Sequence, residues 1–223
     1  MYKLYLLGVH LLLLCFALLL FIKLPCPNAT HQFHDELKAF HYRIDQNLTG
    51  QYVYFIGDSH LQGLAVQEID LPAVNYGMGS DTTEGVLARL PLYQSLSNAR
   101  AIVLGIGFND LRRMEDREVL TNLVKILETM PANIPILYSL LLPIDESKAR
   151  VTIDNQRIDQ FNSLVESKLS GFETLHLINV TEKLKNKQGG LKEEFHIGDG
   201  IHLNRLGNAI YIDEIKQALR RLE

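Results

Sequence analysis

The chain has 223 residues, 47% of them hydrophobic and 22% charged, and its 22 basic and 26 acidic side chains give a net charge of −4. This apolar content excludes a disordered chain, and the mildly acidic balance argues against a nucleic-acid-binding protein, which needs a basic surface. Two cysteines exclude a disulfide scaffold and a cysteine-rich zinc site. The length suits one globular domain with an appendage.

The first segment is a candidate membrane anchor. Between Lys3 and Lys23 lie 19 uncharged, mostly apolar residues, which as a helix would reach roughly 28 Å, close to the hydrocarbon thickness of a bilayer. No A-x-A-like cleavage site follows Lys23, and the apolar stretch is longer than in most signal peptides. We therefore expect residues 1–25 to form an uncleaved N-terminal transmembrane helix, a signal anchor. A cleaved signal peptide and a buried core helix are the alternatives.

The orientation of this segment in a membrane is open, because Lys3 lies on one flank while Lys23, Lys38 and Arg43 lie on the other. A long domain after a short N-terminal tail is compatible with export, since long domains translocate largely regardless of charge. We expect a single-pass protein whose main domain is exported, to the periplasm or another extracytoplasmic compartment.

Residues 26–50 are predicted to form a stem with a short amphipathic helix, because Leu37, Phe40 and Ile44 recur at helical spacing. Three histidines of this stem could be offered as a metal site. No carboxylate or cysteine completes a convincing ligand set, so we expect them to lie on a solvated face of the linker. They are His31, His34 and His41.

From residue 51 onward, apolar runs alternate with amphipathic stretches, which predicts βαβ units and a parallel sheet covered by helices on both faces. We interpret residues 51–223 as one α/β domain. Ligands of such sheets bind beyond the carboxyl ends of the strands, so chemistry is expected just after each run. The predicted strands are Tyr52–Ile56, Ala73–Tyr76, Ala101–Ile106, Ile134–Leu142 and Thr174–Val180, and the predicted helices are Leu61–Ile69, Thr83–Tyr93, Asp116–Met130, Asp154–Leu169 and Leu203–Leu222.

The first run ends in Gly57-Asp58-Ser59-His60. A serine at a strand-to-helix turn can be presented at the top of a sheet as a nucleophile, beside the positive end of the next helix. Asp58 and Ser59 could equally be plain helix caps. This block alone does not decide between the two interpretations.

The second run leads into a loop of small residues, Gly77-Met78-Gly79-Ser80, that can expose backbone N–H groups. Asp81, which follows, has with Glu84 the spacing of a capping box, and we favour that structural role for it. The third run ends before Asn109, whose amide can donate to an oxyanion without titrating. Alternatively, Asn109 is only part of a turn.

The fourth block, Gly198-Asp199-Gly200-Ile201-His202, precedes the last predicted helix. A carboxylate three residues before a histidine can accept the proton of Nδ1 and leave Nε2 free as a base toward a serine hydroxyl. Taken singly, such a histidine is more often ordinary surface or capping chemistry.

Together, the four blocks in this order resemble the GDSL-type (SGNH) hydrolase/esterase family, from about Tyr52 to the C-terminus. The segment from Asn155 to Asn162 and the pair Leu142-Pro143 are similar to the esterase branch of that family. No G-x-S-x-G elbow occurs in the sequence, which argues against the ordinary α/β-hydrolase fold. The resemblance implies a flavodoxin-like three-layer sandwich with a five-stranded parallel sheet, and hydrolysis of a carboxylic ester.

The resemblance also implies the roles of individual residues. Ser59 would be the nucleophile, His202 the general base and Asp199 the residue that orients the imidazole, with no metal and no cofactor. The oxyanion hole would use the N–H of Ser59, the N–H of Ser80 and the amide of Asn109.

Ser80 is a departure from the family's pattern, because relatives usually carry glycine there. A backbone N–H is the donor, so a serine can supply it, but Ser80 would be strained if the position needs a positive φ. We expect Gly57, Gly77 and Gly107 to form turns.

The motifs leave the substrate open. A lipid acyl ester such as a lysophospholipid suits a domain anchored beside lipid, and the small-residue loops suit a small acyl ester. The alternatives are an O-acetyl esterase or acyltransferase acting on a cell-surface glycan, and a catalytically silent, membrane-tethered binding module. The expected partners are the ester substrate and the membrane, without nucleic acid, and the oligomeric state is open. Tyr76, Met78, Phe108 and Leu140 could line an acyl pocket, although such residues at strand ends are more often core.

Overall fold

The computed structural model of the protein describes residues 29–222. The chain divides into two units, with the boundary between Leu37 and Lys38. Helix α2 (Ala29–Asp45) crosses this boundary, so its second half belongs to the unit that contains the sheet. The predicted anchor lies outside the described residues. Within 29–222, no helix is both long enough and apolar enough to cross a bilayer.

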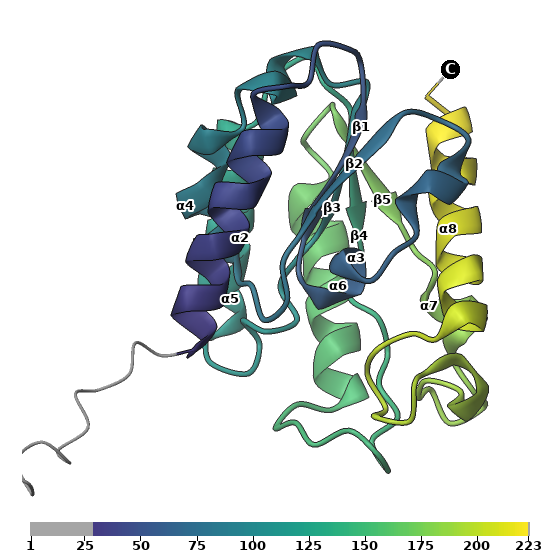
Figure 1. Cartoon of the computed structure of the whole chain (residues 1–223). Coiled ribbons are helices and arrows are strands. Elements are labelled where there is room, and N and C mark those ends of the chain that lie inside the picture. The colour runs from purple at the N-terminus through teal and green to yellow at the C-terminus, as the bar shows by residue number, and fades with distance from the viewer. Residues whose placement is uncertain (1–28, 223) are drawn as a thin grey trace, which may run out of the picture. The chain divides into compact units, whose positions relative to one another are not determined.

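A five-stranded parallel sheet forms the centre of the second unit (Figure 1), which confirms the predicted sheet. The strand order β2-β1-β3-β4-β5 is that of flavodoxin-like folds. Side chains of β1 are buried along its whole length because helices cover both faces of the sheet. The strands are β1 (Val53–Gly57), β2 (Ala73–Gly77), β3 (Ala101–Gly105), β4 (Ile136–Ser139) and β5 (Leu175–Ile178).

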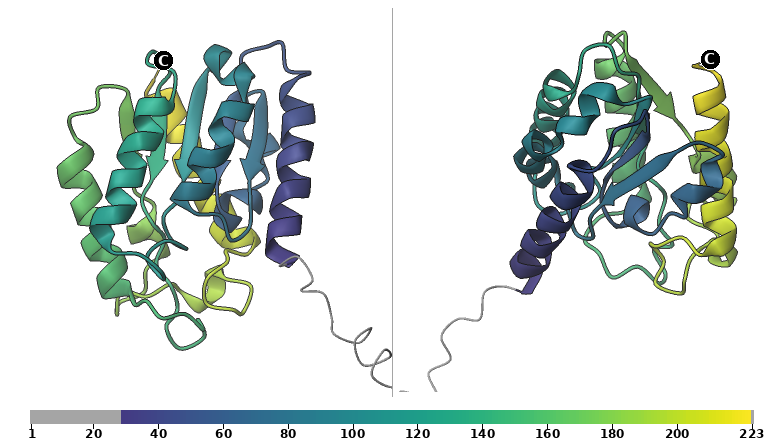
Figure 2. Two further views of the ribbon diagram at one scale, coloured as in Figure 1. Left: turned by 90° about the vertical axis from the view of Figure 1, so that its left-hand side faces the viewer. Right: turned by 45° about the horizontal axis from the view of Figure 1, so that its top comes forward.

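The helices of this unit form a layer on each side of the sheet, as the two views of Figure 2 show. One apolar core contains side chains of α4 (Thr83–Arg89), α5 (Asp116–Thr129) and α6 (Asn155–Leu169). The second core, on the opposite face, contains side chains of α3, α7 and α8. The remaining elements are α3 (Ser59–Gln62), α7 (Thr181–Leu184), α8 (Arg205–Arg220) and the 3₁₀ helices η1 (Val66–Ile69), η2 (Leu90–Leu92), η3 (Gln94–Asn98) and η4 (Glu193–Phe195).

Most predicted elements agree with the observed ones to within two residues at each end, and three differ by more than that, by a break or by a change of helix type. In place of the predicted helix 61–69 there are two short helices. Helix α3 ends at Gln62, with Gly63 as its C-cap residue, and η1 begins at Val66. The helix predicted over 83–93 changes to 3₁₀ geometry at Leu90, where Pro91 lacks the N–H that an α-helix requires. Strand β4 stops at Ser139, and the N–H of Leu141 donates instead to the side chain of Asn162.

The predicted stem helix is present, but its buried face is not the expected one. Phe40 is 47% exposed, whereas His41 and Asp45 are buried. The Nδ1 atom of His41 lies 3.2 Å from the hydroxyl of Tyr93, so the expectation of a solvated face was wrong for this histidine. Burial, with a contribution from Arg89, lowers the pKa of His41 to about 4. The described residues contain no group of three or more potential metal-ligating side chains.

Candidate active site

The site begins where β1 passes into α3. Asp58 has extended backbone geometry and caps α3, since its Oδ1 accepts the N–H of His60 at 3.0 Å. Ser59 is therefore the first helical residue, and its N–H lies among those at a helix start that have no partner within the helix. The predicted helix cap is confirmed for Asp58, and this cap places Ser59 at the strand-to-helix turn.

Two glycines at the strand ends are needed for close approach rather than for turns. A Cβ atom on Gly57 would lie 2.0 Å from the carbonyl oxygen of Gly105, and one on Gly77 would lie 2.3 Å from the backbone nitrogen of Gln62. The expectation of turns was therefore wrong for these two positions. It is confirmed for Gly107, whose φ is +125°.

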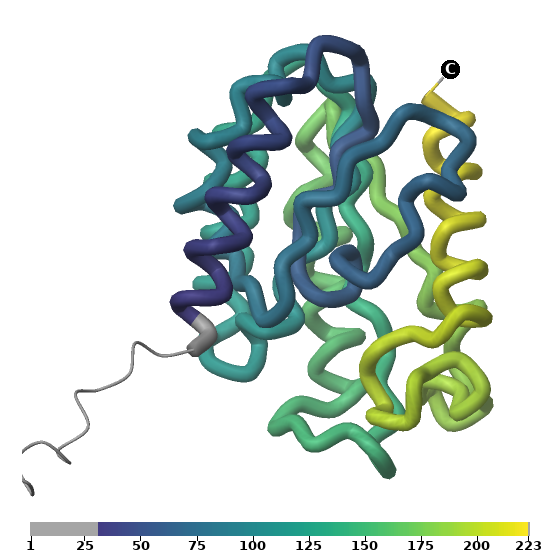
Figure 3. Tube along the Cα trace, viewed as in Figure 1, coloured from purple at the N-terminus to yellow at the C-terminus, as the bar shows by residue number. Residues whose placement is uncertain are grey.

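A serine, a histidine and an aspartate converge beyond the carboxyl end of β1, although Ser59 and His202 are 143 positions apart. In the chain trace of Figure 3, the start of α3 is blue and the loop that leads into α8 is yellow-green. The Oγ atom of Ser59 lies 2.9 Å from Nε2 of His202, and Nδ1 of His202 lies 2.6 Å from Oδ2 of Asp199. The His202 and Asp199 side chains are 41% and 39% exposed, so an external molecule can reach them.

Asp199 is held as an acceptor by several hydrogen bonds. Its Oδ1 accepts the N–H groups of Ile201 and His202, each at 2.9 Å. Partial burial opposes ionisation of Asp199, but these bonds, together with the one from the His202 ring, keep the pKa of the carboxyl below its usual value. The carboxylate is thus arranged to orient the imidazole and to stabilise it when it is protonated.

The two further oxyanion-hole candidates lie on the loops that follow β2 and β3. Ser80 has a φ of +62°, the left-handed region that favours glycine. The conditional expectation of strain at this position is therefore confirmed. Asn109 is 8% exposed, and its Nδ2 donates to the carbonyl oxygen of Asp81 at 3.0 Å. This bond places the amide next to the loop of Ser80.

Asp81 does not cap α4. Thr82 is the N-cap residue, and Asp81 instead forms a buried ion pair with Arg89, with 2.8 Å between Nε and Oδ2. The Arg89 guanidinium also donates to the carbonyl oxygens of Tyr76 at 2.9 Å and of Gly57 at 3.2 Å. Arg89 thus holds the ends of β1 and β2, from which the Ser59 and Ser80 loops start.

Sequence reasoning missed this role of Arg89. A signal was present, because Val86, Arg89 and Leu90 follow helical spacing and so place the arginine on the buried face of the helix. The fully buried Arg89 must be paired, and Asp81 is the carboxylate that the fold brings to it.

The residues proposed to line an acyl pocket are buried in the protein core. Tyr76 is fully buried and stacks on Tyr93, which argues against a substrate contact for it. Met78 and Leu140 are 1% and 2% exposed. Phe108, 5% exposed, lies edge-on to the ring of His60, the residue after Ser59, with 5.6 Å between the ring centroids.

His60 is a further residue of the site that the sequence did not single out. Its ring lies 5.7 Å from the His202 ring, and neither of its ring nitrogens has a hydrogen-bond partner in the described part of the chain. Burial, with a contribution from His202, lowers the pKa of His60 to about 4 although Asp199 opposes the shift. His60 is thus neutral at physiological pH.

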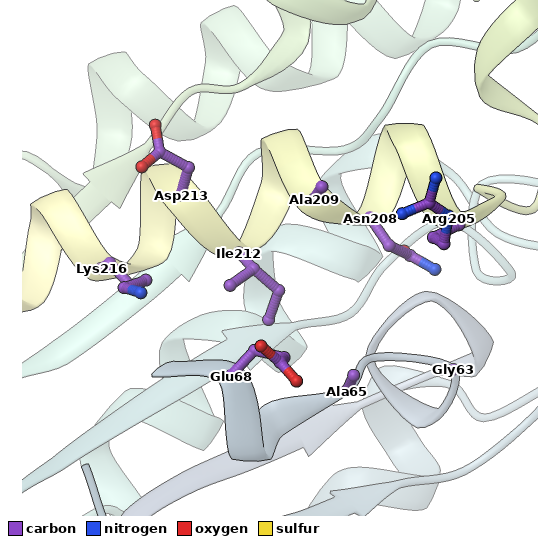
Figure 4. Close-up of a pocket in the computed structure, with 9 residues that line it drawn as sticks. All are labelled: Gly63, Ala65, Glu68, Arg205, Asn208, Ala209, Ile212, Asp213 and Lys216. Atoms are coloured by element: carbon purple, nitrogen blue, oxygen red, sulfur yellow. The ribbon is translucent and has the colours of Figure 1, made fainter. Parts of the chain in front are cut away.

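A cavity of about 650 Å³ lies beside this site, between α8 and the segment from α3 to η1 (Figure 4). Its lining begins close to the triad on both walls: Gly63 donates its N–H to the carbonyl oxygen of Ser59, and Arg205 is three residues after His202. The other lining residues include the charged Glu68, Asp213 and Lys216. None of the three triad side chains lines this cavity.

The fold and the site define a class of protein. A serine hydroxyl hydrogen-bonded to an imidazole, which is hydrogen-bonded to a carboxylate, is the arrangement of enzymes that transfer acyl groups through serine. The sequence pattern of the GDSL-like Lipase/Acylhydrolase family matches residues 53–210. The chain belongs to this family, and it is a GDSL-type carboxylic ester hydrolase.

Full-length relatives and solved structures agree with this membership. The chain is 26% identical over 210 residues to the platelet-activating factor acetylhydrolase IB subunit alpha1 of Pongo abelii, with 89% of each chain covered. The corresponding subunit of Rattus norvegicus is 25% identical, with 89% of this chain and 88% of the relative covered.

Among solved structures, a protein described as a platelet activating factor from Streptococcus pneumonia superposes with a TM-score of 0.80 at 23% identity, covering 86% of this chain and 95% of the other. A GDSL-like lipase from Bacteroides thetaiotaomicron gives a TM-score of 0.72 at 17% identity, with 83% and 98% covered. At these identities the structural likeness concerns the fold.

Proposed function

We propose that this protein hydrolyses a short-chain acyl ester through a covalent acyl-enzyme formed on Ser59. The observation that carries the proposal is the continuous relay from the Ser59 hydroxyl through His202 to Asp199, with contacts of 2.9 and 2.6 Å. These are the distances at which a base can remove a hydroxyl proton and a carboxylate can stabilise the resulting imidazolium.

In the first half of the reaction, Oγ of Ser59 attacks the ester carbonyl carbon while Nε2 of His202 takes the hydroxyl proton. The carbonyl oxygen becomes an oxyanion, which accepts hydrogen bonds from the N–H of Ser59, the N–H of Ser80 and the amide of Asn109. Collapse of this intermediate breaks the bond to the alcohol oxygen, which leaves with the proton from His202.

In the second half, His202 removes a proton from water, and the resulting hydroxide attacks the acyl carbon. The same donors stabilise the second oxyanion, and the proton returns from His202 to Oγ as the acid is released. An alcohol in place of water would give acyl transfer by the same steps, so an acyltransferase is the variant of this function to be separated by product analysis with an added acceptor.

The direct test replaces Ser59 by alanine in the full chain. Hydrolysis of p-nitrophenyl acetate and labelling by a fluorophosphonate probe should both be lost, while the circular dichroism spectrum and Tm stay those of the wild type. A matched control is Ser97→Ala, which removes an exposed serine of η3. Undiminished turnover by Ser59→Ala would refute the proposal, and a wild type without any labelling would favour a silent binding module.

Two observations support a short acyl group. The apolar side chains at the strand ends, Tyr76 and Met78, are buried in the core rather than arranged as an open acyl pocket. The relatives named above are acetylhydrolases by name. A panel of p-nitrophenyl esters from acetyl to palmitoyl should give the highest kcat/KM at two to four carbons, whereas a maximum at eight or more carbons would favour a long-chain lipid acyl ester.

The N-terminal sequence suggests a proposal for the alcohol part of the substrate. We propose that the apolar residues 4–22 anchor the protein to a membrane and that the ester is carried by a lipid, which would bring substrate and enzyme to the same surface. Recovery of the full chain with membranes after an alkaline carbonate wash tests the anchor. Activity on O-acetylated glycan instead of on an acetylated lipid would support the alternative of a glycan O-acetyl esterase.

A further inference from the structure

The loop that carries Asp199 is a narrow hairpin. An antiparallel bridge joins His196 to Leu203, and the N–H of Ile197 donates to the carbonyl oxygen of His202 at 3.0 Å. Asp199 lies inside this hairpin between Gly198 and Gly200, whose φ angles are +103° and +75°. Because glycine permits many backbone conformations, the hairpin needs external contacts to keep the carboxylate in one place.

The ring of His196 supplies these contacts from inside the hairpin. Its side chain is 1% exposed, and Nδ1 accepts the N–H of Gly198 at 3.0 Å and the N–H of Gly200 at 3.2 Å. These are the two residues that flank Asp199. An Nδ1 atom that accepts two hydrogen bonds carries no proton, so the hydrogen-bond network assigns the ring proton to Nε2.

The other side of the ring is held by Asp145. Nε2 of His196 lies 3.3 Å from Oδ2 of Asp145, and the backbone N–H of Asp145 donates to the carbonyl oxygen of Gly200 at 2.8 Å. Hydrogen bonds from Ser147 and from His196 keep the pKa of Asp145 below its usual value. Asp145 is therefore hydrogen-bonded both to the His196 ring and to the backbone of the hairpin.

The segment before Asp145 is fixed in turn by two asparagines of α6. Asn162 accepts the N–H of Leu141 and donates to its carbonyl oxygen, at 2.8 and 2.9 Å. Asn155 makes the same pair of bonds with Ile144, at 2.8 and 2.9 Å. A continuous chain of hydrogen bonds thus runs from the helix layer to Asp145, His196 and the hairpin.

We propose that His196 is a positioning residue for Asp199: its unprotonated Nδ1 holds the two backbone N–H groups that flank the catalytic carboxylate, and its Nε2–H ties this hairpin to Asp145. The proposal rests on the function proposed above for Ser59, Asp199 and His202. His196 does not touch the reacting atoms and acts on the reaction through the position of Asp199.

Replacement of His196 by asparagine or by glutamine distinguishes this hydrogen-bonding role from a role in packing alone. In asparagine, Oδ1 stands about where Nδ1 of histidine stands and can accept the two N–H groups. In glutamine, the amide lies one methylene further out, toward the position of Nε2. His196→Asn should therefore keep the hairpin, His196→Gln should keep only the contact with Asp145, and His196→Leu should keep neither.

The experiment measures kcat, KM and the pH profile of kcat/KM for the full-length wild type and these three variants. His196→Leu and His196→Gln should lose about 10²-fold in kcat with KM within about threefold, because a displacement on the order of 1 Å in a catalytic group costs this much. His196→Asn should lose less than about tenfold. In His196→Leu and His196→Gln, the acid limb of the pH profile of kcat/KM should move to lower pH by about one unit, since the imidazolium of His202 loses its carboxylate partner.

Each outcome decides between the proposals. Retained activity in Ser59→Ala would remove the proposed function and this inference with it. An inactive Ser59→Ala combined with a folded His196→Leu, whose kcat lies within threefold of the wild type and whose acid limb is unmoved, would overturn the positioning role alone. If His196→Leu does not fold, the comparison rests on the two amides: equal kcat values and unmoved acid limbs in His196→Asn and His196→Gln would overturn it equally.

Discussion

The side-chain amide of Asn109 and the backbone carbonyl of Asp81 are joined by a hydrogen bond of 3.0 Å. This bond ties the loop after β3 to the loop after β2, and Asp81 directly follows Ser80. An amide nitrogen carries two hydrogens, so one remains for the oxyanion after Asp81 is satisfied. The spacing between the two proposed oxyanion donors, Ser80 and Asn109, is thus set by a contact that does not involve the substrate.

Replacement of Asn109 by alanine should lower kcat by about 10²–10³-fold, because a single oxyanion donor contributes roughly 3–4 kcal/mol to transition-state stabilisation. KM for p-nitrophenyl acetate should change little, since the donor acts on charge that develops during the reaction. The control is Asn122→Ala, which removes another buried amide, on α5, whose Nδ2 donates to the Thr83 hydroxyl at 3.1 Å. A loss of less than tenfold in Asn109→Ala would exclude Asn109 from this role.

Replacement of Ser80 by glycine should relieve backbone strain without loss of activity. The φ of +62° is unfavourable for serine and ordinary for glycine. Because glycine also gains freedom in the unfolded chain, we expect a net increase of up to about 1 kcal/mol in the free energy of unfolding. Ser80→Ala keeps the strain and the N–H, so it should retain both the stability and the kcat of the wild type. A large fall in kcat in Ser80→Ala would show that the hydroxyl, rather than the N–H, is needed.

Two buried histidines should make the fold sensitive to acid. The pKa values of His41 and His60 are lowered from 6.5 to about 4, mainly by burial, so the unfolded chain binds more protons than the folded protein between these pH values. The contribution of the two histidines to the free energy of unfolding is therefore fully present above about pH 6.5 and is lost as the pH falls toward 4.

His60→Leu isolates one of these contributions and also removes two unpaired buried nitrogens, which should add about 1–3 kcal/mol to the free energy of unfolding at pH 7. Urea unfolding between pH 4 and 8 should show that the advantage of His60→Leu over the wild type grows as the pH falls. His176→Leu, at an exposed position of β5, is the control. An advantage that stays constant with pH would contradict the assignment of a depressed pKa to His60.

Asp58 should change the pH dependence of the free energy of unfolding in the direction opposite to that of the two histidines. Burial, with contributions from the nearby carboxylates of Asp81 and Asp110, raises its pKa from 3.8 to about 7 although the N–H of His60 opposes the shift. Between these pH values the folded protein binds more protons than the unfolded chain, so this contribution to stability is lost as the pH rises.

Asp58→Asn keeps a capping oxygen and removes the charge. Its advantage in the free energy of unfolding should reach up to about 4 kcal/mol at pH 8 and should vanish below about pH 4, where the carboxyl is neutral in both states. Guanidinium unfolding at pH 4, 6 and 8 measures this difference. An Asp58→Asn variant that is less stable than the wild type at pH 8 would show that the carboxylate is satisfied in the fold.

Features that depend on neighbours in the chain were predictable from the sequence alone. The alternation of apolar runs and amphipathic stretches predicted the parallel sheet, and the i, i+3 spacing of Asp199 and His202 predicted their contact, because hydrogen bonds and periodicity over a few residues depend on local geometry. The order of the four blocks then identified the family, and with it the partnership of Ser59 with this histidine.

Packing between distant segments decided the rest. Several features depend on which surfaces meet when the helices cover the sheet. They are the ion pair of Asp81 with Arg89, the positive φ of Ser80, the burial of His41 and the hydrogen bonds from the glycines around Asp199 to His196. A buried polar group must find a partner or shift its pKa, and that partner comes from whichever segment lies opposite in space. The residues by themselves determined which chemistry was available, and the tertiary structure determined which side chains hold it in position.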